Sequence, residues 1–316
     1  MDALIIMLKN VLVFVALAIP GLILVKTKLL KTEASGVLSK VLLYIGMPFL
    51  ILNSTLNVSF NGELLKIIWI SAVIGVVYTM ACFFLSKPWT AMEKEEKTRG
   101  MMRFCSVFTN NGFLGIPLAT AVFPTQPLVL TCVIIINIIT NALMYTLGVF
   151  LISGDKSRIH VKKALCNPVL IAFVIGLILN LIGVKSVLPE ISTYAGYLGG
   201  LVTPLSMLIL GMKLGGVPIK PMFTSWKTYY VSAIKLVAMP AVIVAIALLL
   251  NSVFALGAEL VLGVFVAFAM PTAALATTFA DGYGGDMDNA VSFTLGSTIL
   301  SVATIPLLYW LLLAIL

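Results

Sequence analysis

The sequence predicts an all-α integral membrane protein with ten transmembrane helices, arranged as two inverted repeats of five helices each. The class follows from composition, because 61% of the 316 residues are hydrophobic and only 10% are charged, whereas a soluble domain carries roughly 25% charged residues. The repeat follows from two pairs of prolines inside apolar segments, which recur at nearly the same offset in both halves of the chain. A lipid bilayer is therefore the first expected partner.

Ten apolar runs are long enough to cross a bilayer, which takes about 20 residues in a helix. They are expected at 4–25, 36–56, 64–86, 101–123, 127–152, 165–184, 193–213, 227–250, 257–280 and 288–314. Most of the lysines near the first run follow it rather than precede it. A cleavable signal peptide has its positive charge before the apolar core, so we expect the first run to be a retained span.

Lysine and arginine residues are distributed unequally between the two sides of the membrane that alternate connections define. Sixteen lie on the side of the odd-numbered connections and three on the other side, while Lys235 lies inside a span. Basic loops stay in the cytoplasm, so we expect a multi-pass protein of the cytoplasmic (inner) membrane with both termini outside. The net charge of +8 is spread over short loops, so nucleic acid is not an expected partner.

The fourth span, 101–123, is expected to be an interrupted helix. Its middle holds Asn110, Asn111 and Gly112, followed by Pro117. Side-chain amides at membrane depth are costly unless they find partners, and a proline removes one backbone donor and frees the carbonyl four residues earlier. Broken backbone at this depth is tolerated where it is buried in protein or lines a cavity, which favours a binding site. A kinked helix packed on small residues is the alternative.

The prolines also indicate how the two halves are related. Pro48 and Pro204 are 156 residues apart, and Pro117 and Pro271 are 154 residues apart. Because each half holds an odd number of spans, the halves must cross the membrane in opposite directions, as in secondary transporters whose interrupted helices form the substrate site near the midplane. The expected parts are a first repeat at 1–152, a cytoplasmic inter-repeat loop at 153–164 and a second repeat at 165–316.

Several of these motifs resemble those of the auxin efflux carrier family, whose bacterial members include malonate and malate permeases. The segment 110–118, which reads NNGFLGIPL, resembles the fourth-helix motif of that family. The Met270–Pro271 break and the segments 281–286 and 297–301 resemble its C-terminal half. The resemblance extends over essentially the whole chain.

The resemblance implies ten helices in two inverted repeats, divided into a scaffold domain and a transport domain. Helices four and nine would cross as broken helices at the substrate site, as in sodium/bile-acid symporters. Plant members are homodimers that carry an organic acid anion, so a homodimer is one oligomeric state that the resemblance suggests. The short 153–164 connection fits the bacterial branch. Plant carriers place an Asn before the proline of the ninth helix, where this chain has Met270, so an auxin-like indole acid fits less well.

The two interrupted helices supply the first candidate site residues. The start of a helix carries free N–H groups and a positive dipole end, which suit a carboxylate. Asn110 and Asn111 add amide donors, and the opposing break adds the Thr272 hydroxyl. Amide and carbonyl oxygens suit a sodium ion equally well. The candidate substrate-binding residues of this crossing are Asn110, Asn111, Gly112, Pro117, Met270, Pro271 and Thr272.

Further polar residues lie inside other spans. Asn137, Asn141 and Tyr145 share one face of the fifth span, where they either line the site or hold neighbouring helices together. Asn53 in the second span is a further candidate for lining the site.

Lys235 is the lone ionisable residue well inside a span, where a charge is a functional candidate by default. It would attract the anion or be displaced by a coupling cation, unless it reaches the inner surface. Asp281 begins an acidic, glycine-rich stretch at 281–288 that is expected to be a loop. This stretch would gate an exit or bind a cation, or it is a solvated turn.

These observations predict a secondary carrier of small organic anions, in particular carboxylates, that works by alternating access. Sodium or protons would serve as the coupling ion, and no cofactor, resident metal or enzymatic activity is expected. A symporter or antiporter of inorganic cations is the first alternative. A membrane receptor or channel is the second, and a membrane-embedded enzyme comes last.

Overall fold

The computed structural model describes residues 2–159, 162, 166–217, 224–254 and 257–316. These residues form helices and no strand; their one extended pairing is an isolated antiparallel bridge between Thr109 and Thr272. The prediction of an all-α membrane protein is therefore confirmed. His160, Lys220 and part of the expected 153–164 loop lie outside the described residues.

The first half of the chain contains α1 (Asp2–Lys26), α2 (Ala34–Val41), η1 (Leu42–Gly46), α3 (Met47–Asn57), α4 (Gly62–Trp89), α5 (Glu96–Val107), η2 (Asn111–Gly115), α6 (Ile116–Val122), α7 (Pro127–Leu143), η3 (Met144–Gly148), α8 (Val149–Ser153) and η4 (Lys156–Arg158). The second half contains α10 (Pro168–Leu181), α11 (Val184–Val187), α12 (Glu190–Gly199), α13 (Val202–Gly215), α15 (Trp226–Ala233), η5 (Ile234–Ala238), α16 (Met239–Phe254), α17 (Ala258–Phe268), α18 (Ala276–Tyr283) and α19 (Met287–Leu313). The elements η1, η2, η3 and η5 are π-helical turns within longer helices, and η4 is a 3₁₀ turn.

Seven helical segments of the described chain are long and apolar enough to cross a membrane. They are Leu8–Lys26, Ala34–Asn57, Gly62–Trp89, Pro127–Ser153, Glu190–Gly215, Trp226–Leu249 and Met287–Leu313. The other three predicted spans coincide with shorter apolar helices, at Asn111–Val122, Pro168–Leu181 and Ala258–Phe268. Length and hydropathy thus account for seven spans, and the layout of ten spans stays a prediction.

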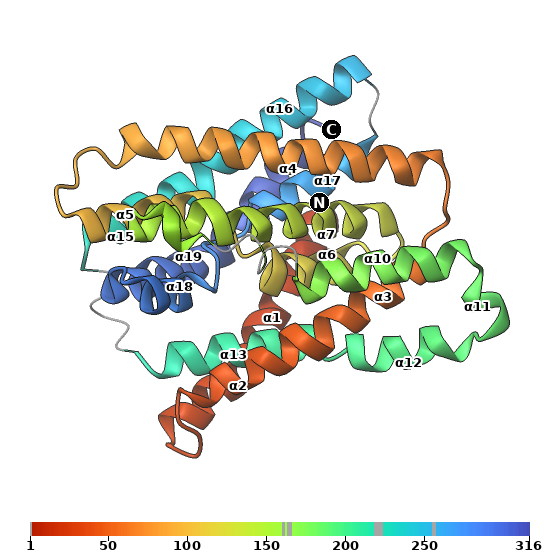
Figure 1. Cartoon of the computed structure of the whole chain (residues 1–316), viewed down its shortest axis with the longest axis horizontal. Helices are drawn as coiled ribbons and strands as arrows, with labels where there is room; N and C mark the ends of the chain where they lie inside the picture. Colours follow the sequence, from red (N-terminus) through yellow and green to blue (C-terminus); the bar gives the residue numbers. More distant parts are fainter. Residues whose placement is uncertain (1, 160–161, 163–165, 218–223, 255–256) are drawn as a thin grey trace.

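The helices pack as two groups (Figure 1). In the first group, α1 packs along α13, and α3 packs against α10 and α12. In the second group, α7 packs between α4 and α17, while α16 and α19 join the same group through α17 and α15. The groups meet where α1 contacts α19 and where α13 contacts η2. In Figure 1, α2 and α13 lie at the bottom and α4 and α16 at the top.

Small residues allow the contact between α1 and α13 to be close. A Cβ atom added to Gly211 would overlap the carbonyl oxygen of Ala18, and one added to Gly21 would overlap that of Leu208. Glycine and alanine at such contacts let two helix backbones approach each other within a membrane. This pair of helices therefore forms a rigid wall beside the centre of the molecule.

The predicted fourth span is interrupted where its sequence is most polar. The helix α5 ends at Val107, Phe108 has extended backbone angles (φ −90°, ψ 134°), and a new helix begins at Asn111. Pro117 is the second residue of α6, directly after the π-helical turn η2. In the predicted ninth span, α17 ends at Phe268 and α18 begins at Ala276, with Pro271 in the gap.

The stretch 281–288 is not a continuous loop, so that expectation is wrong. The helix α18 continues through Asp281 to Tyr283 and ends at Gly284, whose φ of +76° belongs to the left-handed region. Glycine adopts this conformation without the steric cost that a Cβ would impose. Asp286 then caps the next helix, accepting a hydrogen bond from the Asn289 N–H.

Candidate functional site

The two interrupted helices meet at their breaks. Asn110 N–H donates to the Pro271 carbonyl at 2.7 Å, and Ala273 N–H donates to the Phe108 carbonyl at 3.1 Å. These two bonds flank the antiparallel bridge between Thr109 and Thr272. The backbone of each break thus supplies hydrogen-bond partners to the backbone of the other, and buried N–H and C=O groups need such partners.

The two threonines of the bridge perform matching tasks. The Thr109 hydroxyl lies within donor distance of two carbonyls, 3.2 Å from that of Met270 and 3.3 Å from that of Ala267. The Thr272 hydroxyl donates to the Cys105 carbonyl at 3.0 Å. These carbonyls belong to the last turns of α17 and α5 or to the residues just beyond, where a helix leaves acceptors without intrahelical partners. The Thr272 hydroxyl, expected to meet a ligand, therefore stabilises the break.

Asn111, Asn137 and Asn141 form a chain of hydrogen bonds. Asn111 Nδ2 donates to Thr140 Oγ1 at 3.0 Å, and Asn137 Nδ2 donates to Asn111 Oδ1 at 2.7 Å. Asn141 Nδ2 in turn donates to the Asn137 carbonyl at 2.9 Å. Asn111 and Asn137 are each only 2% exposed. The chain ties the start of η2 to α7, so much of the polar capacity of these amides is already used.

Asn110 has different surroundings from Asn111. Its side chain is half-buried, and no hydrogen bond joins it to another side chain within the described residues. It lies between two small cavities. The cavity on the α3 side, of about 40 Å³, is also lined by Gly112, Asn137 and Ala274, and the cavity on the α13 side, of about 20 Å³, reaches Lys213.

Lys213 was not among the residues expected at the site. Its ammonium donates to the Ala274 carbonyl at 3.2 Å, in the break between α17 and α18. Its position in the sequence groups it with the basic residues of an inner connection, but the structure places it in the last turn of α13. The helical spacing of Met207, Leu210 and Leu214 was the signal that the seventh span continues past residue 213.

Lys235 lies on the other side of the crossing. Its side chain is fully buried, and its ammonium donates to the Val107 carbonyl at 3.4 Å. Val107 is the last residue of α5, and the carboxyl end of a helix carries a partial negative charge that favours a cation. The described structure therefore buries this lysine at the centre of the helices instead of directing it to the membrane surface.

Other predicted site residues lie away from the two small cavities. Asn53 accepts a hydrogen bond from Ser192 at 2.9 Å, on the contact between α3 and α12. Tyr145 packs against Phe279, with 5.1 Å between ring centroids. Asp281 is exposed on α18. Pro117 and Met270 are buried in the packing around the breaks.

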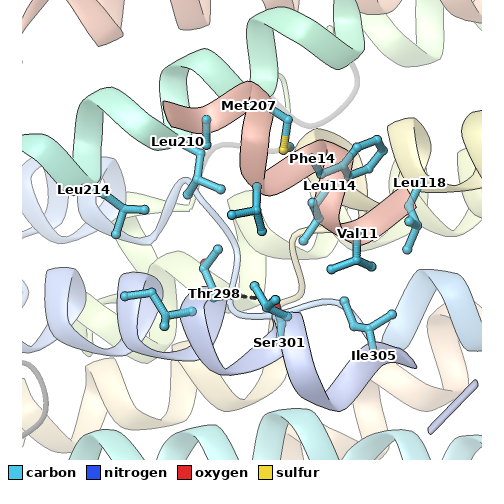
Figure 2. Close-up of a pocket in the computed structure, with 14 residues that line it drawn as sticks. Val11, Phe14, Leu114, Leu118, Met207, Leu210, Leu214, Thr298, Ser301 and Ile305 are labelled. Atoms are coloured by element: carbon cyan, nitrogen blue, oxygen red, sulfur yellow. Dashed lines mark hydrogen bonds between the residues drawn. The ribbon is translucent and has the colours of Figure 1, made fainter. Parts of the chain in front are cut away.

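A larger, apolar cavity adjoins the crossing. It has a volume of about 190 Å³ and lies among α1, α6, α13 and α19. Figure 2 shows Val11, Phe14, Leu114, Leu210 and Ile305 around it. It shares lining residues with the cavity that reaches Asn110 and Lys213.

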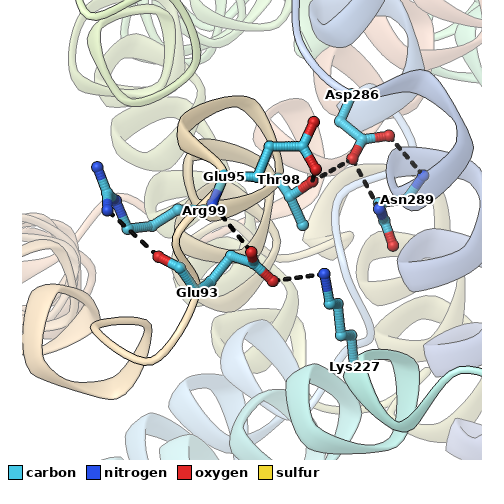
Figure 3. Close-up of polar contacts among 7 residues, drawn as sticks. All are labelled: Glu93, Glu95, Thr98, Arg99, Lys227, Asp286 and Asn289. Atoms are coloured by element: carbon cyan, nitrogen blue, oxygen red, sulfur yellow. Dashed lines mark hydrogen bonds and ion pairs between the residues drawn. The ribbon is translucent and has the colours of Figure 1, made fainter.

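A polar network joins α5, α15 and α19 near their ends (Figure 3). Lys227 forms an ion pair with Glu93 at 2.5 Å, and this hydrogen bond lowers the pKa of the Glu93 carboxyl. Burial alone would raise the pKa of Asp286, but hydrogen bonds from Thr98 and Asn289 outweigh it, so the pKa of Asp286 is lowered. Both carboxylates are therefore held in their charged form at neutral pH.

Comparison with known proteins supports a role in transport. Residues 5–309 match the model of a family described as membrane transport protein. A protein of Methanothermobacter thermautotrophicus, described as an uncharacterized transporter, is 29% identical over 95% of this chain and 96% of its own length. A second uncharacterized transporter, from Methanocaldococcus jannaschii, is 27% identical over 90% of this chain and 92% of its own length.

Proposed function

The chain belongs to the membrane transport protein family, which confirms the resemblance drawn from its fourth-span motif, and we propose that it is a secondary carrier of small organic anions. The anion binds where the two interrupted helices cross. The carrier lies in the cytoplasmic membrane with both termini outside, and its ten spans form two inverted repeats of five.

The observation that carries this proposal is the pairing of the two breaks through Thr109 and Thr272. It brings the first turns of η2 and α18 to one place, because these helices begin at Asn111 and Ala276. The first N–H groups of a helix have no intrahelical partners, and together with the dipole they favour an anion. Gly112, Ala274 and Leu275, from both first turns or the residues beside them, line the same 40 Å³ cavity as Asn110.

The position of the cavities supports alternating access as the mechanism. The 40 Å³ cavity lies between α3 and α10 of the first packing group and η2 and α7 of the second. The 20 Å³ and 190 Å³ cavities likewise lie between the groups, with α13 facing η2 and α19. A displacement of one group against the other would open or close these spaces without breaking the contacts inside either group.

Two lysines supply positive charge to the crossing. Lys213 contacts the carbonyl of Ala274 in one break, and Lys235 contacts the end of the helix that leads into the other. The positive charges of these two lysines would thus balance the negative charge of a carboxylate bound in the crossing. Lys235, which is fully buried, is also the group whose protonation would couple transport to a proton gradient.

Uptake into proteoliposomes tests the proposal. Radiolabelled mono- and dicarboxylates are offered with an imposed proton gradient, sodium gradient or membrane potential. We expect saturable uptake of at least one carboxylate, lost in Asn110→Ala and retained in Asn53→Ala, whose side chain lies on the α3–α12 contact. Uptake of sodium without any carboxylate would instead identify a cation carrier, and flux that does not saturate would identify a channel.

A further inference from the structure

The cavity at Lys213 and the apolar cavity adjoin each other. Leu114, Met207, Leu210 and Thr298 each line both of them. The polar end holds Asn110 and Lys213, next to the break between α17 and α18. The other end extends between α1 and α19 to Val11 and Ile305 (Figure 2).

The polar end suits one carboxylate. An ammonium group has three donors, and Lys213 has one hydrogen-bond acceptor among the described residues, the Ala274 carbonyl at 3.2 Å. No described carboxylate forms an ion pair with it. The Asn110 amide lines the same cavity and offers further donors. A ligand carboxylate can therefore accept from both residues.

The other end suits an apolar group. Thr298 and Ser301 are the polar side chains on its described wall, and both hydroxyls already donate along α19, to the carbonyls of Thr294 at 2.6 Å and Thr298 at 2.7 Å. A second carboxylate placed here would lose its water without gaining a partner, which is costly. The volume of about 190 Å³ exceeds that of an engineered apolar cavity of about 150 Å³ that binds benzene.

We propose that the cavity at Lys213 and the adjoining apolar cavity together bind a monocarboxylate with an apolar body of about six or more carbon atoms. The carboxylate pairs with Lys213 and Asn110, and the apolar body fills the cavity between α1 and α19. This inference rests on the proposed function and narrows it, because it disfavours short dicarboxylates such as malonate. Lys213 and Val302, which lines the apolar cavity, then determine specificity.

Calorimetric titration of the whole protein in lipid nanodiscs tests the proposal, with butyrate, hexanoate, octanoate, octanedioate and malonate as probes and empty nanodiscs as the blank. We expect affinity to rise about fourfold per buried methylene group and octanoate to bind more tightly than octanedioate and malonate. Lys213→Met should lower the affinity for octanoate tenfold or more. Lys40→Met, at an exposed lysine on α2, should leave the affinity for octanoate unchanged.

Two substitutions at one position test the cavity separately from the charge. Val302→Phe should fill the cavity and lower the affinity for octanoate at least tenfold, while it changes the affinity for butyrate less than twofold. Val302→Ala, which enlarges the cavity, should not weaken octanoate. Size-exclusion profiles show which variants fold. If Lys213→Met does not fold, the two Val302 variants still test the proposal.

Other outcomes would overturn the inference in distinguishable ways. Malonate binding that is lost in Asn110→Ala but unaffected by Lys213→Met and Val302→Phe would leave the proposed function standing and refute this substrate class. A change in the phospholipid retained by Val302→Phe, with octanoate affinity unchanged, would assign the cavity to a lipid acyl chain. The absence of binding and uptake for every carboxylate would refute both proposals.

Discussion

Asn110 and Asn111 are neighbours in the chain, but their side chains have different roles in the structure. The Asn111 amide is 2% exposed and bonded to Thr140 and Asn137. The Asn110 side chain faces the two small cavities of the crossing. Asn110 precedes the helix with non-helical backbone angles (φ −82°, ψ 47°), whereas Asn111 is the first helical residue. Asn111 therefore holds the break together, and Asn110 is the residue proposed to meet the ligand.

Alanine substitutions should separate these two roles. Asn110→Ala is expected to abolish uptake with little change in thermal stability. Asn111→Ala is expected to destabilise the protein by about 1–3 kcal/mol, because it leaves buried polar partners unsatisfied, and to reduce uptake as well. Thermal unfolding and proteoliposome uptake check both variants; normal uptake in Asn110→Ala would remove this residue from the site.

Lys235 is a fully buried basic residue, and its proposed role is in transport. A buried charge is costly, and replacing it by an apolar side chain of similar shape is often neutral or stabilising. Lys235→Met is therefore expected to keep or raise the melting temperature while lowering uptake at least tenfold. Lys40→Met, at an exposed position on α2, is the matched control. Unchanged uptake in Lys235→Met would show that this lysine has no part in transport.

The pair formed by α1 and α13 depends on the absence of side chains where the helices touch. A Cβ at Gly211 would overlap the carbonyl oxygen of Ala18, so Gly211→Leu must push the helices apart. Overpacking of this kind typically costs about 1–3 kcal/mol. We expect a lower melting temperature for Gly211→Leu, whereas Gly36→Leu, at a glycine with open space around its Cβ position, should leave it unchanged.

The ion pair between Glu93 and Lys227 links the loop before α5 to α15. The pKa of Glu93 is lowered by Lys227, so the stability it contributes is fully present above the unfolded value of about 4.3 and is lost as the pH falls through the folded value. Glu93→Gln should therefore lower the melting temperature at pH 7, and the difference from the native chain should shrink as the pH falls below the unfolded value of about 4.3. A difference that persists in acid would contradict the charge-based account.

The proposed orientation of the whole molecule rests on its charges. Sixteen of the twenty basic residues are assigned to one side, and basic loops remain in the cytoplasm. Peptide tags at the two termini should therefore react with an impermeant label in intact cells, and a cysteine placed in the 87–95 connection should react only after permeabilisation. Labelling with the opposite pattern would invert the proposed topology.

Composition and local motifs were enough to predict the class of the protein and the positions of its two breaks. Composition alone requires apolar helices, because a bilayer leaves no water to satisfy the backbone. Pro271 lies in one break, and Asn110 and Asn111 lie at the other, so both interruptions could be predicted from the chain. The family could also be predicted from the sequence, because the segment 110–118 resembles its fourth-helix motif.

The contacts of each polar side chain could not be predicted in the same way, because they depend on how the helices pack. In the structure Lys213 donates to the Ala274 carbonyl, Asn53 accepts from Ser192, and Asn110 lines both small cavities whereas Asn111 lines one. These outcomes depend on how each helix is rotated and which neighbours it meets across the two packing groups. Contacts between residues more than 60 positions apart set that rotation, and a local pattern of sequence does not contain them.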